Sequence, residues 1–167
     1  MKTLRLLVTE VCNRGCPGCV NNDWDLNALP VCTDFTEFSM IILTGGEPLL
    51  DVPLVLDVVD RIRETNPTAM VIVYTAYASR VLHVLPYVNG VTLTMHNQAD
   101  VIPVQRLVST VGRLRVDGVP WAVNSSLRLN VFEGVEFGFY TPSWKVKSGI
   151  QWIKDCPLPA NEVFMRL

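Results

Sequence analysis

Three cysteines near the start of the chain are the residues whose type and spacing most clearly indicate chemistry. Cys12, Cys16 and Cys19 form the pattern CxxxCxxC on one short stretch. Thiolates are soft ligands that suit zinc or an iron-sulfur centre. Three cysteines on a four-iron, four-sulfur (4Fe-4S) cluster leave one iron open to an external ligand, which is a catalytic arrangement.

Zinc is the alternative metal for these thiolates. A structural zinc site uses four protein ligands in a tetrahedral array. The fourth would have to be Cys32, His83 or His96, and only the fold could bring one of them near the three cysteines. A non-catalytic, zinc-stabilised binding module is therefore the non-enzymatic hypothesis for this chain.

A second candidate segment for chemistry is Gly45, Gly46, Glu47 and Pro48. Glycine lets the backbone approach a ligand closely. The same residues would also suit a tight turn into a helix, with the Glu47 carboxylate near the positive end of the helix dipole. On its own, this segment supports both interpretations.

The elements that must position these residues follow from the pattern of apolar and β-branched residues. Four short apolar runs predict buried parallel strands: Leu4–Thr9, Met40–Thr44, Met70–Thr75 and Val91–Met95. The cysteines follow the first strand and the GGEP segment follows the second. Because ligands bind at the carboxyl ends of parallel strands, both groups are expected at the same edge of the sheet.

Helices are predicted between the strands. Leu54–Glu64 has one apolar and one charged face, with Pro53 in its first turn. Shorter helices are predicted at Ala78–Leu85 and Pro103–Val111, and a fifth strand at Trp121–Val131. This alternation predicts an α/β fold with a mostly parallel sheet. A complete eight-unit barrel needs about 250 residues, so we expect a partial, open barrel of about four to six units.

The chain is expected to form one domain over residues 1–167, with a core at about 3–131 and an irregular C-terminal extension at 132–167. The stretch 135–152 has no clear period and is left unassigned. From Trp144 onward, the extension is expected to cover an exposed sheet edge or to dock a partner. Cys32 and Cys156 are expected to be buried free thiols.

Together, CxxxCxxC after the first predicted strand and GGEP after the second resemble the radical S-adenosylmethionine (SAM) superfamily. The resemblance implies that the three cysteines bind a 4Fe-4S cluster and that Gly45–Pro48 binds the amino group of SAM. In such enzymes the open iron chelates SAM. An electron from the cluster then cleaves a carbon–sulfur bond, giving methionine and a 5'-deoxyadenosyl radical that abstracts hydrogen from the substrate. The resemblance also implies an electron donor such as flavodoxin or ferredoxin.

Further residues are candidate contacts for SAM or substrate: Thr75, His96, Asn124, Ser126 and Arg128. Thr75 and His96 follow the third and fourth strands. The other three alternate along the fifth predicted strand and would point to one face. Polar side chains facing a barrel interior are costly unless a ligand or hydrogen bonds use them. Each of these residues is also compatible with an ordinary structural role.

Within the superfamily, the local sequence most resembles the anaerobic ribonucleotide reductase activating proteins, which act on a glycyl-radical partner protein. The resemblance lies in Asn21 and Trp24 after the cysteines, in GGEPL, and in a strand running into 74–77. The chain departs from that group at Val20, where an aromatic residue is usual, and at Glu47, where aspartate is usual. The alternative is a 7-carboxy-7-deazaguanine synthase-like enzyme acting on a small pterin, which would need a magnesium site.

Composition excludes other classes of function. The net charge is −2, without the run of like charges typical of a nucleic-acid-binding arm. No apolar stretch approaches the roughly 20 residues of a membrane-spanning helix, and the first ten residues do not fit a secretory signal. We therefore expect a soluble, cytoplasmic protein without a membrane or nucleic-acid partner; the resemblance implies that it is an oxidoreductase or lyase. Basic residues outnumber acidic ones in the second half, which weakly indicates a surface for an anionic substrate or partner.

Overall fold

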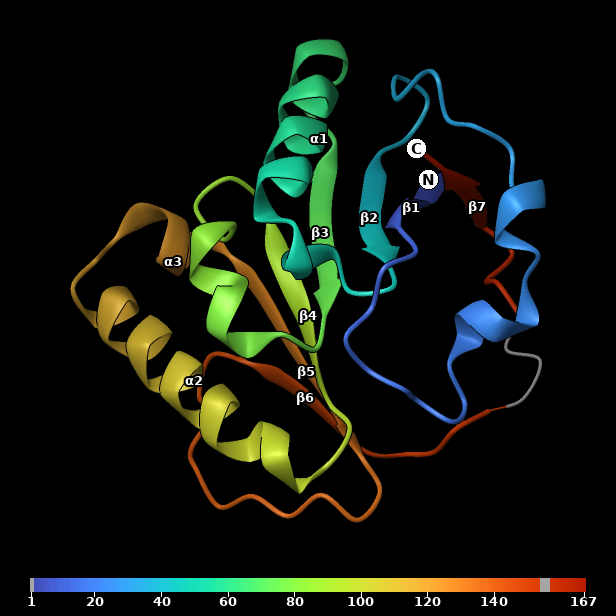
Figure 1. Cartoon of the computed structure of the whole chain (residues 1–167). Coiled ribbons are helices and arrows are strands. Elements are labelled where there is room, and N and C mark those ends of the chain that lie inside the picture. Colours follow the sequence, from blue (N-terminus) through green and yellow to red (C-terminus); the bar gives the residue numbers. More distant parts are fainter. Residues whose placement is uncertain (1, 154–156) are drawn as a thin grey trace.

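A seven-stranded parallel sheet forms the centre of the structure, a computed structural model that describes residues 2–153 and 157–167 (Figure 1). The strands lie in the order β6-β5-β4-β3-β2-β1-β7, and every neighbouring pair is parallel. They are β1 (Thr3–Thr9), β2 (Met40–Gly45), β3 (Met70–Thr75), β4 (Gly90–Met95), β5 (Ser126–Phe132), β6 (Lys145–Ile150) and β7 (Glu162–Arg166). The sheet does not close on itself. The predicted α/β fold, a partial and open barrel, is confirmed.

The two long helices lie over one face of this sheet, as Figure 1 shows. They are α1 (Val52–Thr65) and α2 (Val101–Val116). The Asp51 carboxylate caps α1 by accepting a hydrogen bond from the backbone N–H of Leu54, and Pro53 occupies the first turn, as predicted. Apolar side chains of both helices pack in one core with alternate residues of β1 to β5. We call the helix-covered face the outer face and the opposite one the inner face.

Two predictions about the middle of the chain needed correction. The segment predicted as a helix at 78–85 is a 3-10 helix over Ala78–His83. The strand predicted over Trp121–Val131 is wrong in its first part, because Pro120 starts a short helix, α3 (Pro120–Asn124), and β5 begins only at Ser126. Proline fits the first turn of a helix, where its missing N–H is not needed.

The C-terminal extension is not irregular, which corrects a third prediction. It supplies the strands at the two ends of the sheet, β6 beside β5 and β7 beside β1. The expectation that the tail covers a sheet edge is confirmed for β7, where Phe164 is buried and Glu162 pairs with Arg5 at 2.8 Å.

Cys32 is buried, as expected, whereas Cys156 lies outside the described residues. No helix in the described part of the chain is both long and apolar enough to cross a bilayer.

Candidate functional site

The two motifs lie side by side at the carboxyl edge of the sheet, as predicted. The backbone N–H of Gly46 donates to Thr9 O at 2.7 Å, and that of Glu47 donates to Val11 O at 2.8 Å. These bonds join the cysteine loop (residues 10–19) to the end of β2. Gly45 has a φ of +145°, and a Cβ on Gly46 would lie 2.2 Å from Val11 O. Both positions therefore require glycine for the close approach of the two chain segments.

The three cysteines line one cavity of about 660 Å³, together with residues that include Gly15 and Gly46. Among the described residues, no three His, Cys, Asp or Glu side chains converge on a point suited to a single metal ion. Each thiolate of a 4Fe-4S cluster binds a different iron, so its ligands surround a volume and do not converge on one point. The donor set and the cavity therefore fit a cluster.

The side chains considered as a fourth zinc ligand lie elsewhere. Cys32 is 3% exposed and belongs to the hydrophobic core. His83 is exposed on the 3-10 helix that follows β3. His96 borders a neighbouring pocket that Cys16 shares. In the part of the chain that the structure describes, the cysteine cavity has no histidine and no fourth cysteine in its lining.

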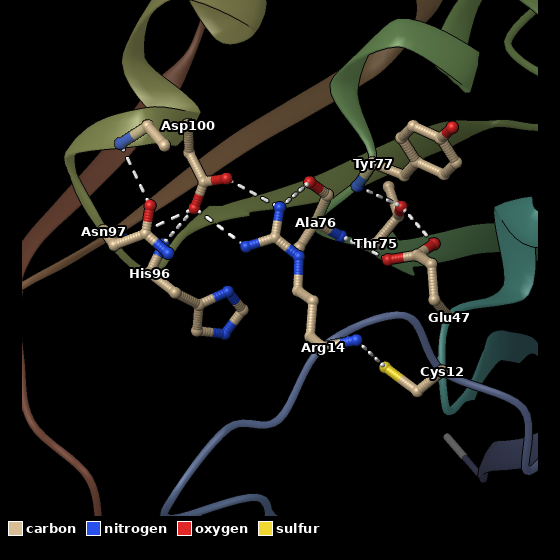
Figure 2. Close-up of polar contacts among 10 residues, drawn as sticks. Cys12, Arg14, Glu47, Thr75, Ala76, Tyr77, His96, Asn97 and Asp100 are labelled. Carbon is tan, nitrogen blue, oxygen red and sulfur yellow. Dashed lines mark hydrogen bonds and ion pairs between the residues drawn. The ribbon is translucent and has the colours of Figure 1, made fainter.

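Arg14, between the first two cysteines, clamps the loop to the neighbouring strand ends (Figure 2). Its Nη1 and Nη2 donate to the two carboxylate oxygens of Asp100 at 3.0 and 2.6 Å, and Nη2 also donates to Ala76 O at 2.9 Å. Ala76 follows β3, and Asp100 precedes α2. A bidentate pair between arginine and carboxylate fixes orientation as well as distance. The clamp thus positions the cysteine loop.

Asp100 is held as a carboxylate by four donors. Besides Arg14, the backbone N–H groups of His96 and Asn97 donate to its Oδ2 at 2.8 and 3.3 Å. Burial acts to raise the pKa of Asp100, but the hydrogen bonds and the charge of Arg14 outweigh it, so this pKa lies below its usual value. The hydrogen bond that Arg14 donates to Asp100 in turn raises the pKa of Arg14. Both partners are therefore charged at neutral pH.

Sequence reasoning missed the role of this pair. The available signal for Asp100 was the capping pattern Asn97-x-x-Asp100, in which the two residues bond each other's backbone. That pattern places Asp100 at a helix start but does not indicate a partner 86 positions away.

The carboxylate of Glu47 is occupied inside the protein. It accepts hydrogen bonds from Thr75 Oγ1 at 2.6 Å and from Ala76 N at 2.8 Å (Figure 2). It also accepts one from Leu49 N at 3.0 Å. Glu47 is only 2% exposed. It therefore ties the end of β2 to the end of β3. Any contact between this segment and a ligand ammonium group falls to backbone carbonyl oxygens.

Thr75 and His96 lie at the predicted edge, with different surroundings. Thr75 is buried, and its hydroxyl donates to Glu47 and accepts from Tyr77 N at 2.9 Å. The His96 ring stacks on Trp152 with centroids 5.4 Å apart, and its Nδ1 is buried without a hydrogen-bond partner in the described residues. Burial, aided by the charge of Arg14, lowers the pKa of His96, so the ring is neutral at pH 7. Contact of either residue with SAM remains a prediction.

Trp152, from the C-terminal extension, was not identified from the sequence as a site residue. Its side chain lies so close to Gly18 that a Cβ added there would be 2.7 Å from Trp152 Cβ. It also lines the pocket of about 1010 Å³ that contains Arg14, Cys16 and His96. The extension thus covers part of the cysteine loop.

Of the three candidate contacts at the fifth predicted strand, two share one strand face as predicted and one does not. Asn124 is exposed in α3, so it cannot share a strand face with the other two. Ser126 and Arg128 do share the inner face of β5, but in its amino-terminal half, away from the edge that carries the cysteines. In a parallel sheet the amino and carboxyl ends of the strands lie at opposite edges.

Comparison with known families matches residues 3–104 to the 4Fe-4S single cluster domain. The matched segment contains both motifs and the first four strands, and it covers more than half of the chain. The search of curated proteins finds no match.

Proposed function

Because the chain belongs to the 4Fe-4S single cluster domain family, whose members are associated with radical SAM chemistry, we propose that it is a radical SAM enzyme. The observation that carries this proposal is the cavity that holds all three cysteines beside Gly46. Three thiolates around one volume suit a cluster with an open iron. The adjoining GGEP backbone supplies oxygen atoms suited to an ammonium group.

In this proposal Cys12, Cys16 and Cys19 bind three irons, and SAM binds the fourth against Gly45–Glu47. The bound cluster and SAM supply a 5'-deoxyadenosyl radical for hydrogen abstraction. The chain itself orients these groups and excludes water from them. The Arg14–Asp100 pair holds the cysteine loop, and Trp152 covers it at Gly18.

For the substrate we propose a glycyl residue of a partner protein, as in the ribonucleotide reductase activating proteins, with a flavodoxin or ferredoxin as electron donor. The supporting observation is that both long helices cover the outer face, whereas the inner face carries neither (Figure 1). A partner could therefore close the site from that side. The second candidate is a small-molecule substrate, as in 7-carboxy-7-deazaguanine synthase, and a pocket on the inner face favours it.

Metal and product analysis tests the chemistry. Anaerobically purified protein is expected to be brown, to contain iron and sulfide, and to form 5'-deoxyadenosine from SAM after reduction. Cys16→Ala should abolish both the colour and SAM cleavage, whereas Cys32→Ala, a matched change in the core, should preserve both. Colourless protein with stoichiometric zinc would contradict the proposal.

The substrate is tested by electron paramagnetic resonance. The reduced enzyme and SAM are mixed with an anaerobic ribonucleotide reductase. A glycyl-radical signal that depends on SAM and is lost in Cys16→Ala supports activation. If 5'-deoxyadenosine forms but no glycyl radical appears, the partner-protein assignment is wrong and the small-molecule candidate takes its place.

A further inference from the structure

A pocket with about 350 Å³ of empty space lies on the inner face, in the amino-terminal half of the strands. Its lining includes Ile42, Ile72, Thr92, Ser126 and Arg128. Thr92 is three residues before Met95, the last residue of β4, which places it roughly 10 Å from the carboxyl edge at 3.3 Å per residue. The pocket is therefore distinct from the cysteine cavity.

The polar groups of this pocket can all donate hydrogen bonds. Thr92 is 4% exposed, and its hydroxyl is buried without a hydrogen-bond partner in the described residues. A buried hydroxyl left unpaired costs about 1–3 kcal/mol, so a ligand that accepts from it gains free energy. The Ser126 hydroxyl and the Arg128 guanidinium are the neighbouring donors. Among the residues that the structure describes, no carboxylate lines the pocket.

The surrounding inner face adds positive charge without compensation. Arg128 has no ion-pair partner in the described part of the chain, and Lys145 is its register partner on β6 and faces the same side. Arg5, on β1, is neutralised by Glu162. Clustered charges of one sign on a concave surface concentrate ions of the opposite sign. The polar end of the pocket thus suits an anion.

The remaining lining is mostly apolar and runs from Met40 and Met70, at the starts of β2 and β3, to Tyr74. Ile42 and Ile72 form part of the wall, and Tyr74 lies one residue before the end of β3. Small-molecule pockets commonly combine an apolar wall with a few convergent polar groups. This pocket has that composition, with its donors at one end.

We propose that this pocket binds a small organic anion, a carboxylate or a phosphate monoester, with its charged group at Thr92, Ser126 and Arg128. The apolar part of the ligand lies against Ile72 and Tyr74 and points toward the cysteine edge. Identifying this ligand as a substrate applies to the second, small-molecule candidate and rests on the proposed radical SAM function. Binding itself does not, because none of the pocket residues belongs to the cysteine loop.

The test is a titration of the full chain in the absence of SAM, once with phenyl phosphate and once with benzoate. Binding is measured by calorimetry or NMR. At least one of these anions is expected to bind, and the tighter of the two identifies the charged group. Benzylammonium, a cation of similar size, should not bind. Arg128→Met should weaken anion binding at least tenfold, and Thr92→Val should weaken it severalfold. Arg113→Met removes an equal charge from the exposed surface of α2 and should change nothing.

Failure of both anions to bind would overturn the pocket, as would binding to Arg128→Met that is as tight as binding to the wild type. Variants are compared after their thermal unfolding is shown to match the wild type. This outcome is separable from the radical chemistry. If the chain binds phenyl phosphate but never forms 5'-deoxyadenosine, the pocket assignment stands and the proposed function is wrong. If it forms 5'-deoxyadenosine but binds neither anion, only the pocket assignment is wrong.

Discussion

Replacing Arg14 with methionine tests the inference that an ion pair, and not only the backbone, positions the cysteine loop. The change keeps most of the side-chain length and removes the guanidinium. It breaks both bonds to Asp100 and the bond to Ala76 O. The carboxylate of Asp100 then keeps only its two backbone donors in a buried setting.

The expected loss of stability follows from how far the pair is buried. The side chains of Arg14 and Asp100 are 22% and 9% exposed. Exposed pairs contribute about 0–1 kcal/mol, and breaking a buried pair costs about 3–5 kcal/mol. For this partly buried clamp we expect a loss of about 2–3 kcal/mol. In a chain of this length, that corresponds to a Tm lower by about 5–10 °C.

The assay combines thermal unfolding, followed by circular dichroism, with the rate of iron release to a chelator from the anaerobic protein. Arg5→Met is the matched control, because Arg5 pairs with Glu162 at 2.8 Å and their side chains are 22% and 13% exposed. Both variants should lose similar stability. Only Arg14→Met should release iron faster, since only Arg14 belongs to the cysteine loop.

Two results would refute this reasoning. The clamp is unimportant if Arg14→Met unfolds within about 0.5 kcal/mol of the wild type, the range of ordinary surface changes. The positioning role is wrong if Arg5→Met releases iron as fast as Arg14→Met. A double variant with Asp100→Asn should lose less stability than the sum of the two single changes, because the two residues share one interaction.

Three further predictions concern the same edge of the sheet. Gly46→Ala should lower both the Tm and the iron content, because the added Cβ would clash with Val11 O. The control is Gly112→Ala in α2, where the Cβ has open space, and this change should stabilise the protein by about 0.5–1 kcal/mol. Glu47→Gln should destabilise by about 1–3 kcal/mol in urea unfolding, since an amide cannot accept all three bonds. The pKa of Asp100 is lowered in the folded state, so its contribution to stability is present above the unfolded pKa of about 3.9 and is lost as pH falls below that value. The difference in unfolding free energy between wild type and Asp100→Asn should therefore shrink only below about pH 4. A difference that already shrinks between pH 7 and pH 5 would contradict the assignment.

Local patterns were sufficient for the first half of the fold. The predicted strands at 4–9, 40–44, 70–75 and 91–95 agree with β1 to β4 within a residue at either end. The predicted helix at 54–64 lies within α1. These elements bury apolar side chains at a regular period, so the pattern is visible in the sequence itself.

Local sequence patterns failed to predict elements whose buried residues do not recur at a regular spacing along the sequence. β6 has the sequence KVKSGI and is almost entirely exposed at the sheet edge, so it lacks the apolar run of an inner strand. The β-branched and aromatic residues after Pro120 favoured a strand, but they form α3. There the position of proline in the first turn outweighs a weak strand propensity.

The sequence by itself determined which groups meet at the carboxyl edge. The cysteines and the GGEP segment each follow a strand that is recognisable from its composition, and parallel strands bring their carboxyl ends together. Only the tertiary structure decided how that edge is held and covered. Arg14 and Asp100 are 86 positions apart, and Trp152 reaches Gly18 from the far end of the chain. No local preference encodes such contacts, because they depend on the order of the strands and on the paths of the loops between them.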